Sequence, residues 1–193
     1  MAWEVVPRDY LNPFFIWRVL RGEYTPPDFE LASVLGIDGK KLKKKGAKVI
    51  FFDADNTLFA HGAREADERV IKKLKQLQEG FELGIITNTY NPKRRGFLHK
   101  YFNKSQGLKM YVCASKVKKP GETPFKDALR KFKYKPSQCV MVGDNLFTDV
   151  VGGKRVGMLT IKVKPYSLES EPVHLRLMRF WGNLVFGLTG FFR

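Results

Sequence analysis

Two aspartates, Asp53 and Asp55, stand one residue apart directly after the apolar run 49–52. The run is apolar on both faces rather than alternating, which is typical of a buried strand in a parallel sheet. Ligands and catalytic groups collect at the carboxyl ends of such strands. Two carboxylates crowded there repel each other unless a cation or a shared proton relieves them. For this pair taken alone, a charged turn that closes the strand is the alternative.

Three further apolar runs, at 83–86, 110–113 and 139–142, also end in polar side chains. In chain order they deliver a hydroxyl and an amide, a group of lysines, and two carboxylates: Thr87, Asn88, Lys116, Lys118, Lys119, Asp144 and Asp149. Carboxylates can hold a hard cation such as Mg2+ through oxygen. A hydroxyl and an ammonium can neutralise a phosphoryl group beside it. The combination predicts phosphoryl chemistry and is more specific than any one of its parts.

The elements that must position these residues alternate along the chain. Apolar periodicity predicts helices over 67–80, 93–102 and 123–132, and residues 158–163 read as a fifth strand. Strands alternating with helices predict an α/β fold with a doubly wound parallel sheet and right-handed crossovers. The intervals from Asp53 to Thr87 and from Thr87 to Lys119 are largely consumed by one helix and its strand. Neither leaves room for an inserted lid domain, so we expect an open site.

The four motifs resemble, in order and context, those of the haloacid dehalogenase (HAD) superfamily of phosphohydrolases, over roughly residues 48–165. Within the superfamily they look like the YqeG-type phosphatases, a group that includes the mitochondrial and plastid phosphatidylglycerophosphate phosphatases. The residues that carry this second resemblance are Asp55-Asn56-Thr57-Leu58, Lys119-Pro120 with Phe125, Ala128 and Leu129, and the run 143–157. The resemblance implies an HAD-like (Rossmannoid) sheet with no cap domain.

The resemblance also implies roles for the carboxylates. Asp53 would be the nucleophile that forms an aspartyl-phosphate, which splits the transfer into two steps. Asp55 would protonate the leaving oxygen and then deprotonate the hydrolytic water. Mg2+ would be bound by the Asp53 carboxylate, the Asp55 backbone carbonyl and Asp144, with Asp149 close by, directly or through water.

The remaining implied roles concern the phosphoryl group. Thr87 and Asn88 would donate hydrogen bonds to its oxygens. Lys119 would neutralise the charge of the aspartyl-phosphate. Lys116 and Lys118 are nearby rivals for this role, and Lys119 is preferred because it carries the Lys-Pro of the family pattern.

Composition sets limits on partners and on location. A chain of 193 residues supports one domain with a sizeable core and short extensions. A net charge of +16 and a pI near 9.9 predict an anionic binding partner: a phosphorylated substrate, an anionic lipid surface or nucleic acid. We detect no secretory signal and no apolar run of the roughly 18 to 20 residues that cross a bilayer. An intracellular location, in cytoplasm or organelle matrix, is therefore expected.

We divide the chain into a basic, partly helical N-terminal extension (1–46), the phosphatase domain (47–165) and a C-terminal amphipathic tail (166–193). Asn12-Pro13 predicts a short helix over 14–21. In the tail, a stripe of apolar residues follows Val173 at helical spacing beside Arg176 and Arg179: Leu177, Phe180, Trp181, Leu184, Val185 and Leu188. Interfacial helices show this pattern, and so does a terminal helix packed on its domain.

Together these observations favour an Mg2+-dependent phosphatase that is peripheral on an anionic membrane and converts phosphatidylglycerophosphate to phosphatidylglycerol. One alternative is an HAD phosphatase for a soluble phosphomonoester. The other is a basic ribosome- or RNA-associated protein with secondary catalysis, although we find no RNA-binding motif and expect no nucleic-acid partner. The oligomeric state is not predicted. We expect removal of residues 180–193 to spare the turnover of soluble substrates, because Asp53, Asp55 and Lys119 lie elsewhere in the chain.

Overall fold

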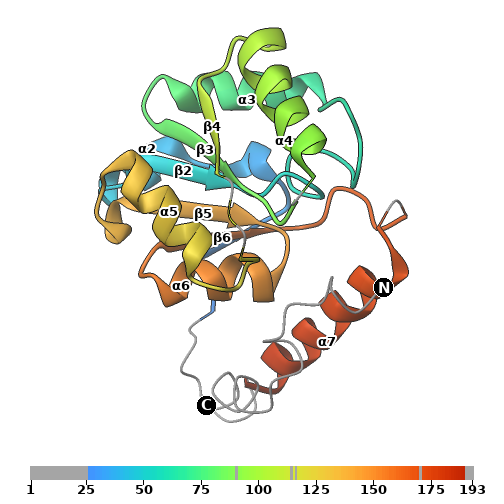
Figure 1. Ribbon diagram of the computed structural model, residues 1–193. Helices are drawn as coiled ribbons and strands as arrows, with labels where there is room; N and C mark the ends of the chain where they lie inside the picture. The colour runs from blue at the N-terminus through green and yellow to red at the C-terminus, as the bar shows by residue number, and fades with distance from the viewer. Residues whose placement is uncertain (1–25, 90, 114, 116, 170, 190–193) are drawn as a thin grey trace.

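The computed structural model describes residues 26–89, 91–113, 115, 117–169 and 171–189. Six strands form one sheet in the order β1-β6-β5-β2-β3-β4, and every neighbouring pair is parallel (Figure 1). The strands are β1 (Phe29–Leu31), β2 (Val49–Phe52), β3 (Glu82–Ile86), β4 (Met110–Cys113), β5 (Cys139–Gly143) and β6 (Leu159–Val163). The predicted α/β fold is confirmed. The helix expected over 14–21 lies outside the described residues.

The central strand β2 is buried along its whole length, as its continuous apolar sequence predicts. Val49 and Phe51 contribute to one hydrophobic core, and Ile50 and Phe52 contribute to the other on the opposite face of the sheet. Helices cover both faces (Figure 1). On the core of Ile50 and Phe52 lie α2 (Gly39–Lys44), α3 (Glu68–Gln78) and α4 (Pro92–His99), and on the core of Val49 and Phe51 lie α5 (Thr123–Phe132) and α6 (Gly152–Arg155).

The helices begin where the sequence provides capping groups. The Asp67 carboxylate accepts the backbone N–H of Arg69 at the start of α3, and the Asn91 side chain accepts that of Lys93 at the start of α4. The helix expected over 93–102 is divided between α4 and a π-helical segment, η4 (Lys100–Ser105). Helix α5 has the bounds that the periodicity predicts.

The order of the strands puts the site at a topological switch point. From β2 the chain runs outward to β3 and β4, and then returns to β5 on the other side of β2. Asp53 follows β2 and Asp144 follows β5, so both lie at the edge where the direction of winding reverses. Open α/β sheets bind their ligands in the crevice at this point.

The connections beside the site are short in the part of the chain that the structure describes. Between β2 and β3 there is one loop (53–67) and α3, and between β3 and β4 there are α4 and η4. No inserted lid domain is found there, as the spacing predicts. The described residues also contain no helix with both the length and the apolar character needed to cross a bilayer.

The sheet also includes a strand that the sequence did not predict. Residues of β1 pair with β6, and the Asp28 carboxylate accepts hydrogen bonds from the Thr160 backbone N–H (2.7 Å) and from Lys154 Nζ (2.6 Å). Residues 28–31 belong to the segment assigned to the N-terminal extension, so the sheet reaches into that segment.

Candidate active site

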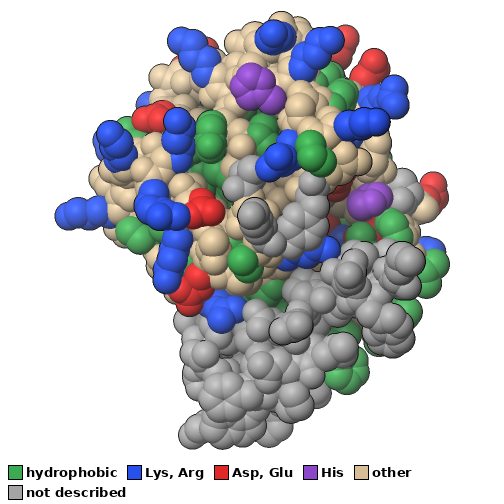
Figure 2. Space-filling model, in the orientation of Figure 1, with side chains coloured by type: hydrophobic (Ala, Val, Ile, Leu, Met, Phe, Trp, Pro, Cys, Tyr) green, Lys and Arg blue, Asp and Glu red, His purple; other side chains and the backbone are tan. Residues whose placement is uncertain are grey.

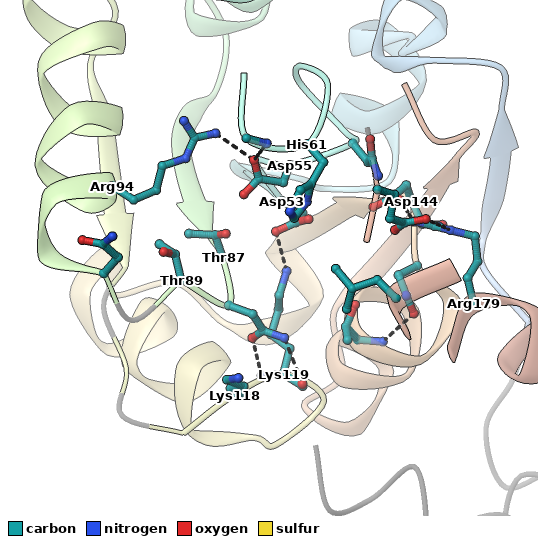
Figure 3. A pocket seen from close by; sticks show the side chains of 18 residues that line it. Asp53, Asp55, His61, Thr87, Thr89, Arg94, Lys118, Lys119, Asp144 and Arg179 are labelled. Atoms are coloured by element: carbon teal, nitrogen blue, oxygen red, sulfur yellow. Dashed lines mark hydrogen bonds and ion pairs between the residues drawn. The ribbon is translucent and has the colours of Figure 1, made fainter. Parts of the chain in front are cut away.

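The carboxyl ends of the central strands open into a cavity of about 420 Å³. Residues from the predicted catalytic set line it, together with residues that the sequence did not indicate (Figure 3). The predicted ones are Asp53, Asp55, Thr87, Asn88, Lys118, Lys119 and Asp144. Asp149 is buried and bonded to Lys119, and Lys116 lies outside the described residues.

Lys119 is at the centre of the site although its side chain is only 1% exposed. Its Nζ atom donates to Asp53 Oδ1 (2.8 Å), to Asp149 Oδ1 (2.6 Å) and to the backbone carbonyl of Ile86 (2.7 Å). An ammonium has three donors, and these three contacts use them all. Lys119 therefore joins the end of β2 to the segment that follows β5.

Asp149 can reach this position because the strand before it, β5, ends in a glycine, Gly143. It lies on η6 (Leu146–Val151), a π-helical segment that begins just after β5. A Cβ atom on Gly143 would lie 2.2 Å from Asp149 Oδ2, so only glycine leaves room for the carboxylate to fold back over the strand. The backbone N–H of Asn145 donates to the same oxygen (3.1 Å). The glycine of the Gly143-Asp144 pair is thus required for steric reasons.

The carboxylates of Asp53, Asp144 and Asp149 form a cluster in which one oxygen of each lies within 4.8 Å of the others. Burial raises the pKa of Asp53 to about 8; the Lys119 ammonium lowers it, and Asp149 and Asp144 raise it further. Burial likewise raises the pKa of Asp144 to about 6, against the opposing effect of Arg179. Crowded, buried carboxylates of this kind fit a hard cation that takes oxygen ligands.

Asp55 points away from this cluster, toward α4. Its Oδ1 atom accepts hydrogen bonds from the backbone N–H of Gly62 (3.0 Å) and from Arg94 Nη2 (2.7 Å) (Figure 3). The Arg94 guanidinium also lies over the rings of Phe59 and Phe97, 5.0 and 5.1 Å from their centroids. These contacts fix the Asp55 carboxylate at the wall of the cavity, which leaves its backbone carbonyl for the role implied at the metal.

Comparison with known proteins agrees with this geometry. The sequence model of haloacid dehalogenase-like hydrolases matches residues 30–163. The chain belongs to this family. It is 35% identical over 140 residues to the probable phosphatase YqeG of Bacillus subtilis, and the match covers 72% of this chain and 77% of that protein. With this relative and others named as phosphatases, the protein is an HAD phosphatase.

Two other relatives are longer than the chain. Phosphatidylglycerophosphate phosphatase 1, chloroplastic/mitochondrial, of Arabidopsis thaliana is 29% identical over 166 residues, which is 81% of this chain and 46% of the relative. The glyceraldehyde 3-phosphate phosphatase of Pyrococcus furiosus is 34% identical over 120 residues, which is 56% of this chain and 45% of the relative. The chain therefore spans less than half the length of each of these two.

In this HAD phosphatase the Asn88 side chain has a use that its predicted role did not include. Its Oδ1 atom accepts the backbone N–H of Lys119 (2.7 Å), and its Nδ2 atom donates to the Lys119 carbonyl (3.2 Å). The amide thus holds the main chain of Lys119 on both sides. Thr87, which precedes it, lines the cavity (Figure 3). The contacts support Asn88 as a residue that positions Lys119, and its predicted contact with phosphoryl oxygens stays a prediction.

The C-terminal helix α7 (Val173–Thr189) forms one wall of the HAD site through Leu175 and Arg179. Arg179 Nη2 lies 2.6 Å from Asp144 Oδ2, and Arg179 Nη1 donates to the Asp144 carbonyl (3.0 Å). Of the two alternatives left open for the tail, packing on the domain is therefore found on this side of α7. On a helical projection Arg179 is simply a polar residue, and nothing local indicates a partner 35 residues earlier in the chain.

Arg94 was also missed by the sequence analysis. It stands in a run of three basic residues, Lys93, Arg94 and Arg95, at the start of a predicted helix. Such a run is ordinarily a solvated face. The rotation of α4 about its axis decides which of the three side chains faces Asp55, and it is Arg94. That rotation is set only when the chain folds.

Proposed function

We propose that this HAD phosphatase hydrolyses phosphatidylglycerophosphate to phosphatidylglycerol and phosphate, in an Mg2+-dependent reaction through an aspartyl-phosphate on Asp53. The observation that carries the proposal is the position of α7. One side of this helix lines the catalytic cavity, and its other side exposes apolar residues to solvent. A lipid held in a surface could thus present its phosphomonoester to Asp53 without leaving that surface.

The covalent step would be carried by Asp53. Its carboxylate attacks phosphorus, the bond from phosphorus to the alcohol oxygen breaks, and Asp55 gives its proton to that oxygen. Asp55 then takes a proton from water, which attacks the phosphorus of the aspartyl-phosphate and releases phosphate and the Asp53 carboxylate. Hydrogen bonds from Arg94 and Gly62 would keep Asp55 in place through both steps.

The negative charge of the transferred phosphoryl group would be neutralised by two cations, Lys119 and Mg2+. Lys119 already contacts Asp53 and would neutralise the phosphorylated carboxylate. Asp53, Asp144 and Asp149, with the Asp55 carbonyl, would hold Mg2+. When bound, the ion would supply Lewis-acid stabilisation of the phosphoryl oxygens.

The proposed partner is an anionic lipid surface. The exposed apolar residues of α7, named here the outer face, are Val173, Leu177, Phe180, Trp181 and Leu184, with 43 to 66% of each residue exposed. Burial of apolar area gains about 25 cal/mol per Å², and each Lys or Arg close to an anionic surface adds roughly 1 kcal/mol. Basic side chains also predominate over acidic ones on the face of the molecule in Figure 2. The net charge of +16 favours the same partner.

A panel of phosphomonoesters tests the substrate. Phosphate release would be measured from phosphatidylglycerophosphate in mixed micelles, from glyceraldehyde 3-phosphate and from p-nitrophenyl phosphate, and kcat/KM compared. We expect the lipid to be preferred by at least tenfold. Equal or better turnover of glyceraldehyde 3-phosphate, which the similarity to the Pyrococcus furiosus enzyme would favour, refutes the lipid substrate and leaves the Asp53 chemistry standing. Retention of RNA without retention of lipid would favour the RNA-associated alternative.

A further inference from the structure

Helix α7 contacts the catalytic domain along a narrow strip. The Arg179 side chain is 11% exposed, and Gly182, one turn later, is buried in a helix whose outer face is open to solvent. A Cβ atom on Gly182 would lie 2.6 Å from Cδ2 of Phe147, so the helix backbone rests directly on that ring. Phe147 belongs to η6, the segment that also carries Asp149. The strip therefore contacts η6, the segment that supplies Asp149 to the carboxylate cluster.

Arg179 holds Asp144 at two points. Its guanidinium reaches the Oδ2 atom of the carboxylate and the backbone carbonyl of the same residue. The other carboxylate oxygen, Oδ1, accepts from the Thr57 hydroxyl (3.3 Å). Hydrogen bonds to Oδ1 and to the main chain, together with the ion pair at Oδ2, hold the Asp144 carboxylate in place relative to Asp53 and Asp149, and Oδ2 accepts no hydrogen bond from the described residues.

Arg179 does this without adding net charge to the cluster, because it is paired with Glu171. Glu171 Oε1 accepts from Arg179 Nη2 (2.5 Å), and Oε2 accepts from Nε (3.2 Å). The Glu171 side chain is 4% exposed. An Arg–Glu pair that is neutral as a whole can orient a carboxylate and still leave the cluster attractive to a cation. The planar fork of the guanidinium presents several donors in fixed directions, which suits it to bridge Glu171 and Asp144.

We propose that Arg179 is a positioning residue of the phosphatase site, which fixes Asp144 in the orientation that binds Mg2+, so that the docked helix α7 completes the metal site. The inference rests on the proposed Mg2+ chemistry at Asp144 and is independent of which phosphomonoester is the substrate. Helix α7 would then have two functions: its inner side would orient a metal ligand, and its outer face would bind the lipid surface.

The test compares three variants of the full chain. Glu171→Gln with Arg179→Gln removes the bridge and keeps the net charge unchanged. Arg179→Lys keeps the charge and loses the fork. Arg176→Gln is the matched control, because Arg176 is an exposed arginine on the same helix. Mg2+ affinity would be measured by titration calorimetry without substrate, and the Mg2+ dependence of p-nitrophenyl phosphate hydrolysis would be measured in parallel.

Loss of the group that orients a metal ligand typically costs about 10- to 100-fold in affinity or activity. We expect the double variant to bind Mg2+ at least tenfold more weakly, Arg179→Lys to fall between it and the parent, and Arg176→Gln to match the parent. An affinity within twofold of the parent, or a tighter one, overturns the inference.

The experiment also remains decisive if a variant unfolds or if the parent protein binds no Mg2+. If circular dichroism shows that the double variant is unfolded, Arg179→Lys decides alone, and an affinity within twofold of the parent then overturns the inference. A parent that binds no Mg2+ overturns both the proposed metal chemistry and the role of Arg179. A parent that binds Mg2+ and hydrolyses phosphomonoesters, with variants that bind Mg2+ equally well, overturns the role of Arg179 alone.

Discussion

Replacing Lys119 by methionine should destabilise the metal-free protein far more than the loss of an ordinary lysine. The substitution roughly keeps the volume of the side chain and removes an ammonium that is 1% exposed and bonded to Asp53 and Asp149. Removing one partner of a buried ion pair costs about 3–5 kcal/mol, because the other charge stays buried without compensation. Against a typical stability of about 5–15 kcal/mol this is a large fraction. Half or more of the variant could then be unfolded under mild denaturant.

The effect has a defined dependence on pH. Burial already raises the pKa of Asp53 to about 8, and without the ammonium this pKa should rise further. At pH values between the unfolded pKa of Asp53 and its raised folded value, the folded state binds more protons than the unfolded state. The free energy of unfolding therefore falls as the pH rises. Below pH 8 Asp53 is largely protonated in both folded proteins, so the loss caused by Lys119→Met should change little there; it should grow above pH 8, where the parent gains a charged Asp53 paired with Lys119 and the variant does not.

Urea denaturation in the presence of chelator, at pH 7 and at pH 9, measures both the loss and its pH dependence. Lys126→Met is the control, because Lys126 is 62% exposed and its i,i+4 pair with Glu122 contributes only about 0.3–0.5 kcal/mol. Added Mg2+ should restore part of the lost stability by replacing the missing positive charge. A loss within about 0.5 kcal/mol, as at an ordinary surface site, would refute the reasoning, and so would a loss that is larger at pH 7 than at pH 9.

Three other outcomes are expected. Asp53→Asn should abolish phosphate release and leave the circular dichroism spectrum unchanged, because an amide cannot form the acyl-phosphate; activity within about tenfold of the parent would contradict this. Chelator should abolish hydrolysis of p-nitrophenyl phosphate, Mg2+ should restore it, and Asp144→Ala should mimic chelation; equal hydrolysis in chelator would mean that the carboxylate cluster has been misinterpreted. Leu177→Ser with Phe180→Ser should weaken binding to anionic vesicles about 100-fold, since about 1.5 kcal/mol is lost per side chain. The same pair should slow turnover of phosphatidylglycerophosphate and leave that of p-nitrophenyl phosphate unchanged, and parallel loss of both activities would show that the outer face is structural.

The strands that build the site could be predicted because each contains an apolar run of at least four residues, with polar side chains following within a few positions. That pattern depends only on burial of both faces, as in β2, and needs no knowledge of neighbours. Strand β1 could not be found this way, because it has three residues at the edge of the sheet and Phe29–Leu31 is only partly buried. Its pairing with β6 is visible only in the folded chain.

Within the site, the sequence could name residue types at strand ends but could not say which side chains meet. Lys118 and Lys119 are adjacent and chemically alike, yet Lys119 is the one whose Nζ lies beneath Asp53. Asn88 and Arg94 contact partners 31 and 39 residues away. Such contacts depend on the phase of a helix and on the path of a loop, which local periodicity does not fix.

The two-sided character of α7 changes what a truncation of the tail should do. Gly182 rests on Phe147, and that contact lies beyond position 180, so a chain that ends before Phe180 loses the packing that holds Arg179 against Asp144. Removal of 180–193 should therefore lower the turnover of both lipid and soluble substrates, and added Mg2+ should recover part of the soluble activity by mass action. Substitutions on the outer face leave this contact intact and should affect the lipid alone. A truncated protein that keeps full activity on p-nitrophenyl phosphate at limiting Mg2+ would show that the inner side of α7 contributes nothing to the metal site.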